Sequence, residues 1–277
     1  MTAAVIDRTR AVGRSARAFY AIGKSDALAY PLAFGLSVFS RLTNVFLYYF
    51  VARIVTTDES VVAGGYFAFS VVGTLVLWVL GAGLEVFGSF VQRTIDQGHL
   101  ELYLVQPVAW PLLPFLWFQW LVVERLVAGV ATIAVAYGLG VRFETDRLPM
   151  AILVLALGIA ATHAIGVIAS SVRLLSKRAD PVLLAYTVAS TVFSGLFVPV
   201  QVLPGFLQAV SWMIPHTYAV DALRQLLLEG GEASSRISVM EAVLALSAFS
   251  VVAYTVGLVL FTRSLHYARR RGILGSY

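Results

Sequence analysis

Six long apolar runs constrain this chain more than any other feature of its sequence. They cover residues 31–55, 64–90, 111–139, 149–173, 182–203 and 238–262. A helix needs about 20 apolar residues to cross a bilayer, and each run reaches that length. Hydrophobic residues make up 59% of the chain and charged residues 13%, whereas soluble proteins carry about 45–50% and about 25%. We therefore expect an all-α integral membrane protein with six transmembrane helices in a single domain of residues 1–277.

The distribution of Lys and Arg predicts the orientation of these helices. If both termini lie in the cytoplasm, the segments on that side hold most of the 20 basic residues, and the opposite side holds only Arg53, Arg142, Arg147, Arg224 and Arg236. Basic residues are retained on the cytoplasmic side of a membrane, so this asymmetry favours cytoplasmic termini. The net charge of +5 then reflects topology, and no nucleic-acid partner is expected.

The two end segments are polar and basic. Residues 1–30 place Arg10, Arg14 and Arg17 three or four positions apart, which suits a helix lying in the cytoplasmic interface beside anionic lipid headgroups. The same residues also suit an ordinary positive-inside flank. Residues 263–277 form a basic tail, which we expect in the cytoplasm.

Prolines interrupt the apolar sequence before the last run. Pro199, Pro204 and Pro215 divide residues 192–231 into pieces too short to span a bilayer, yet the pieces stay apolar. Non-helical backbone at membrane depth persists only where protein or water satisfies it. Residues 204–237 are therefore predicted to form short re-entrant outer helices, as in a transporter.

Four charged residues, Arg41, Glu85, Glu124 and Arg125, fall inside predicted spans. An ionised group there costs on the order of 3 kcal/mol unless it is paired or hydrated. Glu124 and Arg125 are adjacent and point about 100° apart on a helix, so each needs a partner elsewhere. We expect Arg41 to pair with Glu124 or Glu85. The charges suit a structural ion pair, the favoured interpretation, or a polar relay between moving helices.

The run 149–173 carries a stripe of small residues, Gly158, Thr162, Gly166 and Ser170, at four-residue spacing. Small residues let transmembrane backbones approach closely, which predicts a packing seam within the fold or against a second protomer. His163 on the same run is expected to be an interhelical hydrogen-bonding group.

The chain carries no evident catalytic or metal-binding set. It has no cysteine, and its four histidines are scattered singly without an H-E-x-x-H pair. Gly23-Lys24-Ser25 resembles the end of a phosphate-binding loop, but Ala18 occupies the position of its first glycine. We expect no catalytic residue, no metal and no cofactor on this chain, so an active transporter of this kind must take its energy from a partner.

The loop between the second and third runs, residues 92–110, reads as a short amphipathic helix. Leu100, Tyr103 and Leu104 share one face, and Pro107 ends it. Asp96 and Glu101 make the loop slightly acidic on the side where basic residues dominate. That pattern favours docking of a soluble protein over binding to lipid.

Two segments resemble the ABC-2 type permeases, the membrane subunits of bacterial ABC exporters. Residues 98–108 are similar to the G-T-L-E-x-L-x-x-T-P-[VL] segment of that family, with matches that include Gly98, Leu100, Glu101 and Pro107. These four residues and Leu104 are the expected contacts with an ATPase. His99 and Gln106 replace the two threonines. Residues 193–230 are similar to a second family signature, rich in proline, and its matching positions are Ser194, Gly195, Pro199, Leu203, Pro204, Pro215, Thr217, Tyr218, Asp221 and Arg224.

The resemblance implies a permease of an ATP-driven exporter in the bacterial inner membrane. It implies two separate ATP-binding subunits, which hold ATP and Mg²⁺, and a second permease protomer in a homo- or heterodimer. Residues 98–107 would be the coupling helix on the ATPase. The residues of an outer gate would be Ser194, Gly195, Pro199, Pro204, Pro215, Tyr218 and Arg224. The path would lie between protomers, lined by residues 66–85 and by Thr187, Thr191 and Ser194.

The substrate follows from analogy only. A hydrophobic drug-like molecule or a lipid is the first expectation, and a polysaccharide or glycolipid is the alternative. A secondary transporter that works without an ATPase is a further alternative, and it would show inverted repeats with broken helices in both halves.

Overall fold

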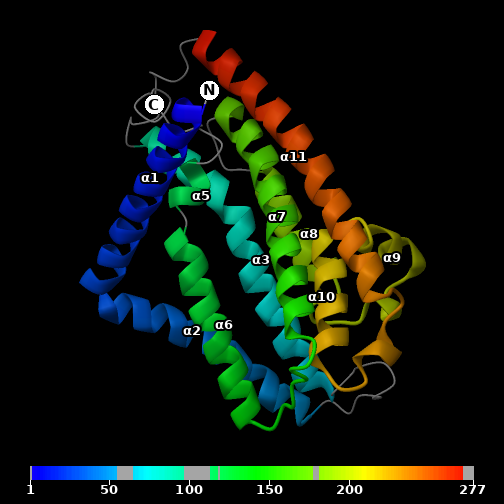
Figure 1. The fold of residues 1–277 in the computed structure, drawn as a ribbon. Coiled ribbons are helices and arrows are strands. Elements are labelled where there is room, and N and C mark those ends of the chain that lie inside the picture. Colours follow the sequence, from blue (N-terminus) through cyan, green and yellow to red (C-terminus); the bar gives the residue numbers. More distant parts are fainter. Residues whose placement is uncertain (1, 55–64, 97–112, 118, 177–180, 271–277) are drawn as a thin grey trace.

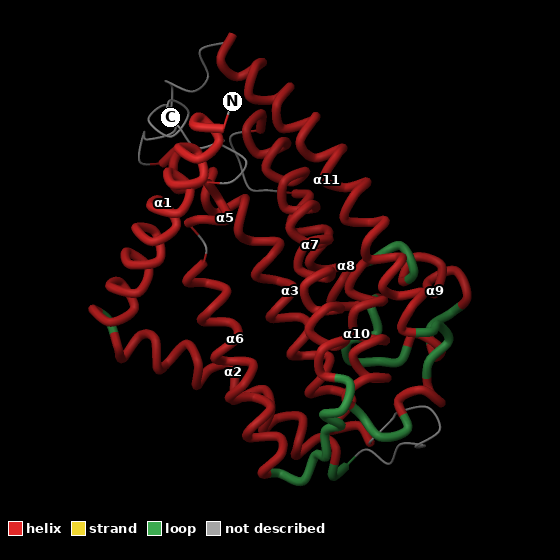
Figure 2. Tube along the Cα trace, in the orientation of Figure 1, coloured by secondary structure: helices red, strands yellow, loops and turns green. Residues whose placement is uncertain are grey.

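The computed structural model describes residues 2–54, 65–96, 113–117, 119–176 and 181–270 (Figure 1). The described parts are helical throughout apart from loops and one isolated antiparallel bridge, Phe143 with Leu228 (Figure 2). The helices are α1 (Thr2–Ala29), α2 (Pro31–Ala52), α3 (Gly65–Asp96), α5 (Leu113–Trp117), α6 (Gln119–Gly138), α7 (Leu148–Ser176), α8 (Pro181–Phe193), η2 (Val200–Val202), α9 (Gly205–Ser211), α10 (Pro215–Leu227), η3 (Gly231–Ser234) and α11 (Val239–Arg270).

Five of the described helices are long and apolar enough to cross a membrane, namely α2, α3, α6, α7 and α11. The all-helical membrane fold is thus confirmed. The predicted fifth span, 182–203, is wrong in length, because α8 ends at Phe193 after 13 residues. At about 1.5 Å per residue α8 is about 20 Å long, less than the hydrocarbon thickness of about 30 Å.

Two boundaries also differ from the sequence-based expectation. Helix α3 continues to Asp96, and α11 continues to Arg270. The first eight residues of the predicted tail, 263–270, are therefore helical. No proline or glycine lies between 258 and 271, so nothing in the local sequence ends α11 at 262. The described helices of the run 111–139 are α5 and α6.

Helix α3 forms the centre of the chain, with α7, α6, α2 and α10 packed around it (Figure 1). Its apolar window is 78% buried within the chain, whereas that of α2 is 6% buried. The outer face of α2 carries exposed Leu32, Leu36, Phe39 and Phe50, as expected of a helix in contact with lipid. Because α3 touches α2, α5, α6, α7 and α10, a shift of α3 would reach all of these helices.

The small-residue stripe of α7 is the seam against α3. A Cβ on Gly166 would lie 2.5 Å from the carbonyl oxygen of Leu84, and one on Gly83 would lie 2.6 Å from Oγ1 of Thr162. Thr162 also donates a hydrogen bond to the carbonyl of Leu80 at 2.9 Å. Of the two interpretations of the stripe, the structure thus supports packing inside the fold.

Two buried histidines connect helices through tyrosines. Nδ1 of His163 on α7 lies 2.8 Å from the hydroxyl of Tyr254 on α11, which confirms the expected interhelical hydrogen bond. Nδ1 of His216 on α10 lies 3.0 Å from the hydroxyl of Tyr186 on α8. Each pair satisfies polar groups where water is scarce, and so fixes the contact of its two helices.

Helix α1 meets α2 at a sharp angle and runs back along α5 and the start of α6 (Figure 1). A Cβ on Gly23 would lie 2.5 Å from Cβ of Trp120, so this glycine allows a close approach of α1 to α6. Gln119 donates to the carbonyl of Ala16 at 3.3 Å, and the rings of Tyr20 and Trp120 meet edge to face. The expected N-terminal helix is thus present and attached to α6, while its place in the lipid interface stays a prediction.

Candidate functional site

The candidate site is the folded-back segment between α8 and α11. After α8 the chain turns at Ser194 and Gly195, forms η2 and α9, and returns as α10 (Figures 1 and 2). Pro204 immediately precedes α9, and Pro215 lies in the first turn of α10. Backbone N–H groups at a helix start have no partner within the helix, so a proline there loses no hydrogen bond. The prolines therefore set the short helices that the sequence predicted.

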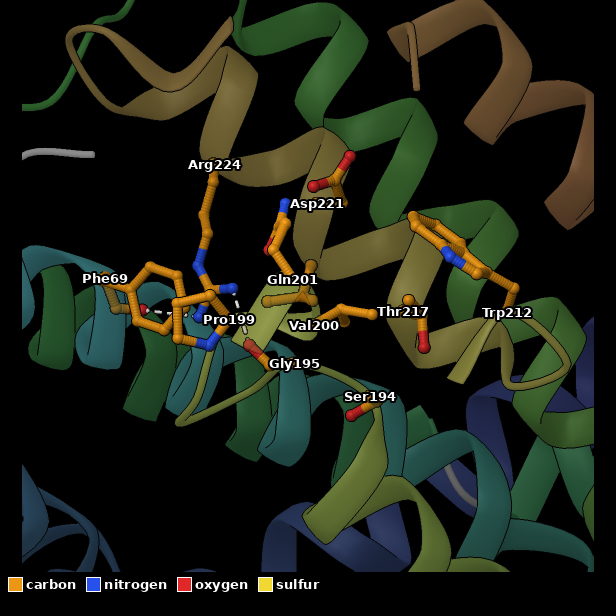
Figure 3. Close-up of a pocket in the computed structure, with 11 residues that line it drawn as sticks. Phe69, Ser194, Gly195, Pro199, Val200, Gln201, Trp212, Thr217, Asp221 and Arg224 are labelled. Atoms are coloured by element: carbon orange, nitrogen blue, oxygen red, sulfur yellow. Dashed lines mark hydrogen bonds between the residues drawn. The ribbon is translucent and has the colours of Figure 1, made fainter. Parts of the chain in front are cut away.

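Arg224 on α10 is the central residue of this segment. Its side chain reaches across to α3 and to the turn after α8, as Figure 3 shows. Nη1 donates to the carbonyl of Gly195 at 2.7 Å, and Nη2 donates to the carbonyls of Leu196 and Phe69 at 2.8 and 2.9 Å. The residue is only 6% exposed. One buried guanidinium thus joins three parts of the chain that are far apart in sequence.

An aromatic ring completes the environment of Arg224. Its guanidinium carbon lies 3.2 Å from the ring centroid of Phe69, a cation–π contact (Figure 3). Nε of Arg224 has no partner among the described residues. Its three carbonyl contacts and the ring offset much of the cost of burying the charge.

Two glycines make this geometry possible. Gly195 has a φ of +78°, a left-handed conformation that favours glycine and allows the chain to reverse after α8. A Cβ on Gly73 of α3 would lie 2.0 Å from the carbonyl oxygen of Leu196. Only glycine at 73 lets the turn approach α3 closely enough for Arg224 to hold both.

A small cavity lies beside Arg224. It has a volume of about 20 Å³, and the residues that line it include Phe69, Ser194, Gly195, Pro199, Val200, Gln201, Trp212, Thr217, Val220, Asp221 and Arg224 (Figure 3). A water molecule needs about 10–15 Å³ of such volume, so the cavity has room for about one. A drug-like substrate or a sugar does not fit there in this conformation. The structure therefore describes this segment packed shut.

Side-chain hydrogen bonds hold the rest of the segment. Gln225 donates to Ser235 at 2.8 Å and to the carbonyl of Ile237 at 2.9 Å, and Ser235 donates to Asp221. Tyr218 donates to the carbonyl of Trp212 at 2.8 Å. These contacts tie α10 to the chain that leads into α11 and to the end of α9.

The structure brings together most, not all, of the predicted gate residues. Ser194, Gly195, Pro199 and Arg224 line the cavity. Pro204, Pro215 and Tyr218 do not line it, and instead begin the two short helices or brace them.

An exposed ion pair joins η3 to the residue just before α7. Arg147, just before α7, pairs with Glu232. The hydrogen bond and charge of Glu232 raise the pKa of Arg147 further above its usual range. The nearby main chain is also linked, since the N–H of Glu144 donates to the carbonyl of Leu227 at 2.9 Å.

The four charges inside spans form two ion pairs across three helices. Nη1 of Arg41 on α2 lies 2.9 Å from Oε1 of Glu124 on α6, one of the two partners that the sequence predicted for it. Nη2 of Arg125 on α6 lies 3.2 Å from Oε2 of Glu85 on α3, a pairing that sequence reasoning did not assign. The adjacent residues of α6 do turn to different neighbours. The sequence could have predicted the second pair. Once Arg41 pairs with Glu124, Arg125 and Glu85 are the other two of the four charges inside spans.

Other predicted residues are placed as follows. Gly98, Leu100, Glu101, Leu104 and Pro107 of the expected coupling helix lie outside the described residues. Of the expected path residues, Thr187 is exposed, Thr191 is half-buried and Ser194 is buried. Helix α3 is mostly buried between residues 66 and 85, but Trp78 and Glu85 lie partly open on one face. Whether these residues line a path stays a prediction.

No group of three or more His, Cys, Asp or Glu side chains that could hold a metal ion occurs among the described residues.

Comparisons with known proteins identify the family of the chain. A search of curated proteins found no match. The signature of the ABC-2 type transporter family matches residues 17–228, which include α2, α3, α6, α7 and the folded-back segment through α10. The chain therefore belongs to the ABC-2 type transporter family.

Proposed function

We propose that this chain is the permease subunit of an ATP-driven exporter. The observation that carries the proposal is the family match over residues 17–228. In this proposal two copies of a separate ATP-binding subunit hydrolyse ATP with Mg²⁺, and a second permease protomer, identical or different, completes the path. The assembly lies in a bacterial inner membrane with both termini in the cytoplasm. The substrate leaves the cell, and a hydrophobic drug-like molecule or a lipid is the leading class.

The packing of the folded-back segment supports a role as an outer gate. The cavity beside Arg224 has room for about one water molecule, so the segment blocks solutes where it stands. Besides apolar packing, side-chain hydrogen bonds join its short elements, and these bonds can be remade in a second arrangement. Because α10 touches α3, α7 and α11, a movement of those helices would reach the gate.

Energy enters this scheme through the loop at 98–107. ATP binding in the partner would favour one arrangement of the helices, and ATP release the other. Glu101 lies in the segment that resembles the family's coupling helix. A carboxylate there is suited to a basic groove on the ATPase.

A complex-formation experiment tests this proposal. The chain is co-expressed with candidate ABC ATP-binding subunits, purified in detergent and reconstituted, and ATP hydrolysis is measured. We expect a stable complex with ATPase activity, and we expect Glu101→Arg to lower complex formation about tenfold or more by placing like charges at the contact.

The matched control is Glu229→Arg, the same charge reversal at an exposed turn. It should leave the complex intact. Failure of every ATPase to bind the wild-type chain would argue against the proposal and in favour of a secondary transporter. Equal activity in Glu101→Arg and wild type would remove only the coupling role of the loop.

A further inference from the structure

One face of α3 changes from buried to open along its length. Val71 and Thr74 are 1% and 2% exposed. Trp78, Gly81 and Glu85, which continue the same face at helical spacing, are partly or fully open. A Cβ on Gly81 would meet no atom within 4 Å. We call these three residues the Trp78–Glu85 stripe.

The stripe presents a carboxylate outward. Glu85 has a side chain that is 53% exposed, whereas that of its partner Arg125 is 16% exposed. The contact joins only Oε2 of Glu85 to one nitrogen of Arg125. The other ion pair, Arg41 with Glu124, is mostly buried at 16% and 19% exposure. Although the four charges sum to zero, the one most open to the surroundings is negative.

The depth of Glu85 gives this exposure a consequence. Glu85 lies about 30 Å along α3 from Gly65, which is about the thickness of the hydrocarbon layer. It therefore lies near one boundary of that layer, the inner one in the orientation proposed above. The pair with Arg125 engages Oε2 of the carboxylate, and exposing the rest of an ionised carboxylate to acyl chains is unfavourable. Water or a cation in front of Glu85 removes that cost.

Trp78 and Gly81 indicate what kind of cation would fit. Trp78 lies two helical turns from Glu85, about 10 Å along the axis. Its indole ring presents a large apolar surface, which suits the apolar part of such a cation. Gly81 leaves space between the two side chains. A carboxylate, an open glycine and an indole on one face combine charge recognition with apolar contact over the length of a small amphiphilic molecule.

We propose that the Trp78–Glu85 stripe binds an amphiphilic organic cation. The charged group lies at Glu85 near the inner leaflet, and the apolar part lies toward Trp78. Such cations gather at this depth of a bilayer, with the charge close to the headgroups and the body among the acyl chains. The stripe is closed beyond Trp78, where Thr74 and Val71 are buried, so a bound cation goes no further in this conformation. As a substrate site, the stripe rests on the proposed function, and as a binding site it does not.

Binding can be measured on the full chain without any ATPase. The purified protein is placed in phosphatidylcholine nanodiscs, and equilibrium binding of radiolabelled tetraphenylphosphonium is compared with that of tetraphenylborate, an anion of the same size. Empty nanodiscs supply the background. We expect saturable binding of the cation and none of the anion. Glu85→Gln should weaken cation binding about tenfold, and Trp78→Leu about threefold.

Glu229→Gln is the control, because it removes an exposed carboxylate that is not part of the stripe. It should leave binding within twofold of wild type. Wild-type protein that binds both probes equally, or unchanged binding in Glu85→Gln, overturns the proposal. So does a second copy that covers the stripe, seen as a wild-type dimer that excludes the probe and dissociates in Glu85→Gln. If Glu85→Gln does not fold, the charge preference of the wild type and the effect of Trp78→Leu decide.

The outcome is separable from that of the proposed function. Cation binding by a chain that forms no ATPase complex would support the cation site and argue against the ABC exporter proposal. An active ATPase complex whose permease shows no cation preference would support the exporter proposal and argue against the cation site.

Discussion

At the scale of single residues, Arg224 shows how one side chain can hold a re-entrant segment. Its three carbonyl partners come from α3 and from the turn after α8. A hydrogen bond to a charged group contributes about 1.5–3 kcal/mol, more than a neutral one. The same side chain stacks on Phe69. The segment thus depends on Arg224 more than on any of its prolines, which act locally.

Arg224→Leu should destabilise the protein by about 3–5 kcal/mol, because three buried carbonyls lose their donor. The thermal midpoint in detergent should fall by roughly 10 °C. Arg224→Lys should also lower the thermal midpoint, since one ammonium cannot form the planar fork that reaches all three oxygens. The exposed Arg236, which donates to Gln208 at 2.9 Å, provides the control. If Arg236→Leu lowers the midpoint as far as Arg224→Leu, the clamp has no special role.

Sequence reasoning reached part of this picture. The motif around 193–230 identified Arg224 as a site residue. The cost of buried charge predicted that Arg41 pairs with Glu124 or Glu85, and the structure selects Glu124. The three carbonyls could not be foreseen, because one of them lies 155 positions away in sequence and backbone oxygens carry no residue-specific signal. The exposure of Glu85 was also hidden, since it depends on which face of α3 its neighbours leave open.

At the scale of elements, the seam between α3 and α7 determines how closely the two central helices pack. The stripe at four-residue spacing was visible in the sequence, but its partner was not. The same spacing suits a dimer contact equally well. The early end of α8 was invisible for a related reason: residues 194–203 stay apolar, so hydropathy continues where the helix stops. The change lies in the backbone at Gly195, whose φ is +78°.

Gly166→Ala should separate α7 from α3. The new Cβ would lie 2.5 Å from the carbonyl oxygen of Leu84, and backbone on both sides cannot yield without moving a helix. We expect a loss of about 1–3 kcal/mol, measured as a lower thermal midpoint. Gly35→Ala in α2 meets no atom within 4 Å and should be neutral or gain about 0.5–1 kcal/mol of helix propensity. Equal midpoints for the two variants would contradict the tight seam.

At the scale of the whole molecule, the open question is which end faces the cytoplasm. Helices α6 and α7 run antiparallel and are joined by residues 139–147, whereas α1 lies near the other end of α6 (Figure 1). We therefore expect positions 24 and 146 to lie on opposite sides of the membrane. Lys24 and Asp146 are both exposed. The chain has no cysteine, so a single introduced cysteine is the only thiol of the protein that can react with a maleimide.

Single-cysteine labelling in intact cells can then fix the orientation. A membrane-impermeant maleimide should label Asp146→Cys directly, because basic residues place the 139–147 loop outside. It should label Lys24→Cys only after the membrane is permeabilised. Ala161→Cys, at a position that is fully buried, should react in neither state until the protein is denatured. The reverse labelling pattern at positions 24 and 146 would show that the protein has the opposite orientation in the membrane. Glu85 would then face the outer leaflet, and the cation site proposed there would accept its ligand from outside the cell.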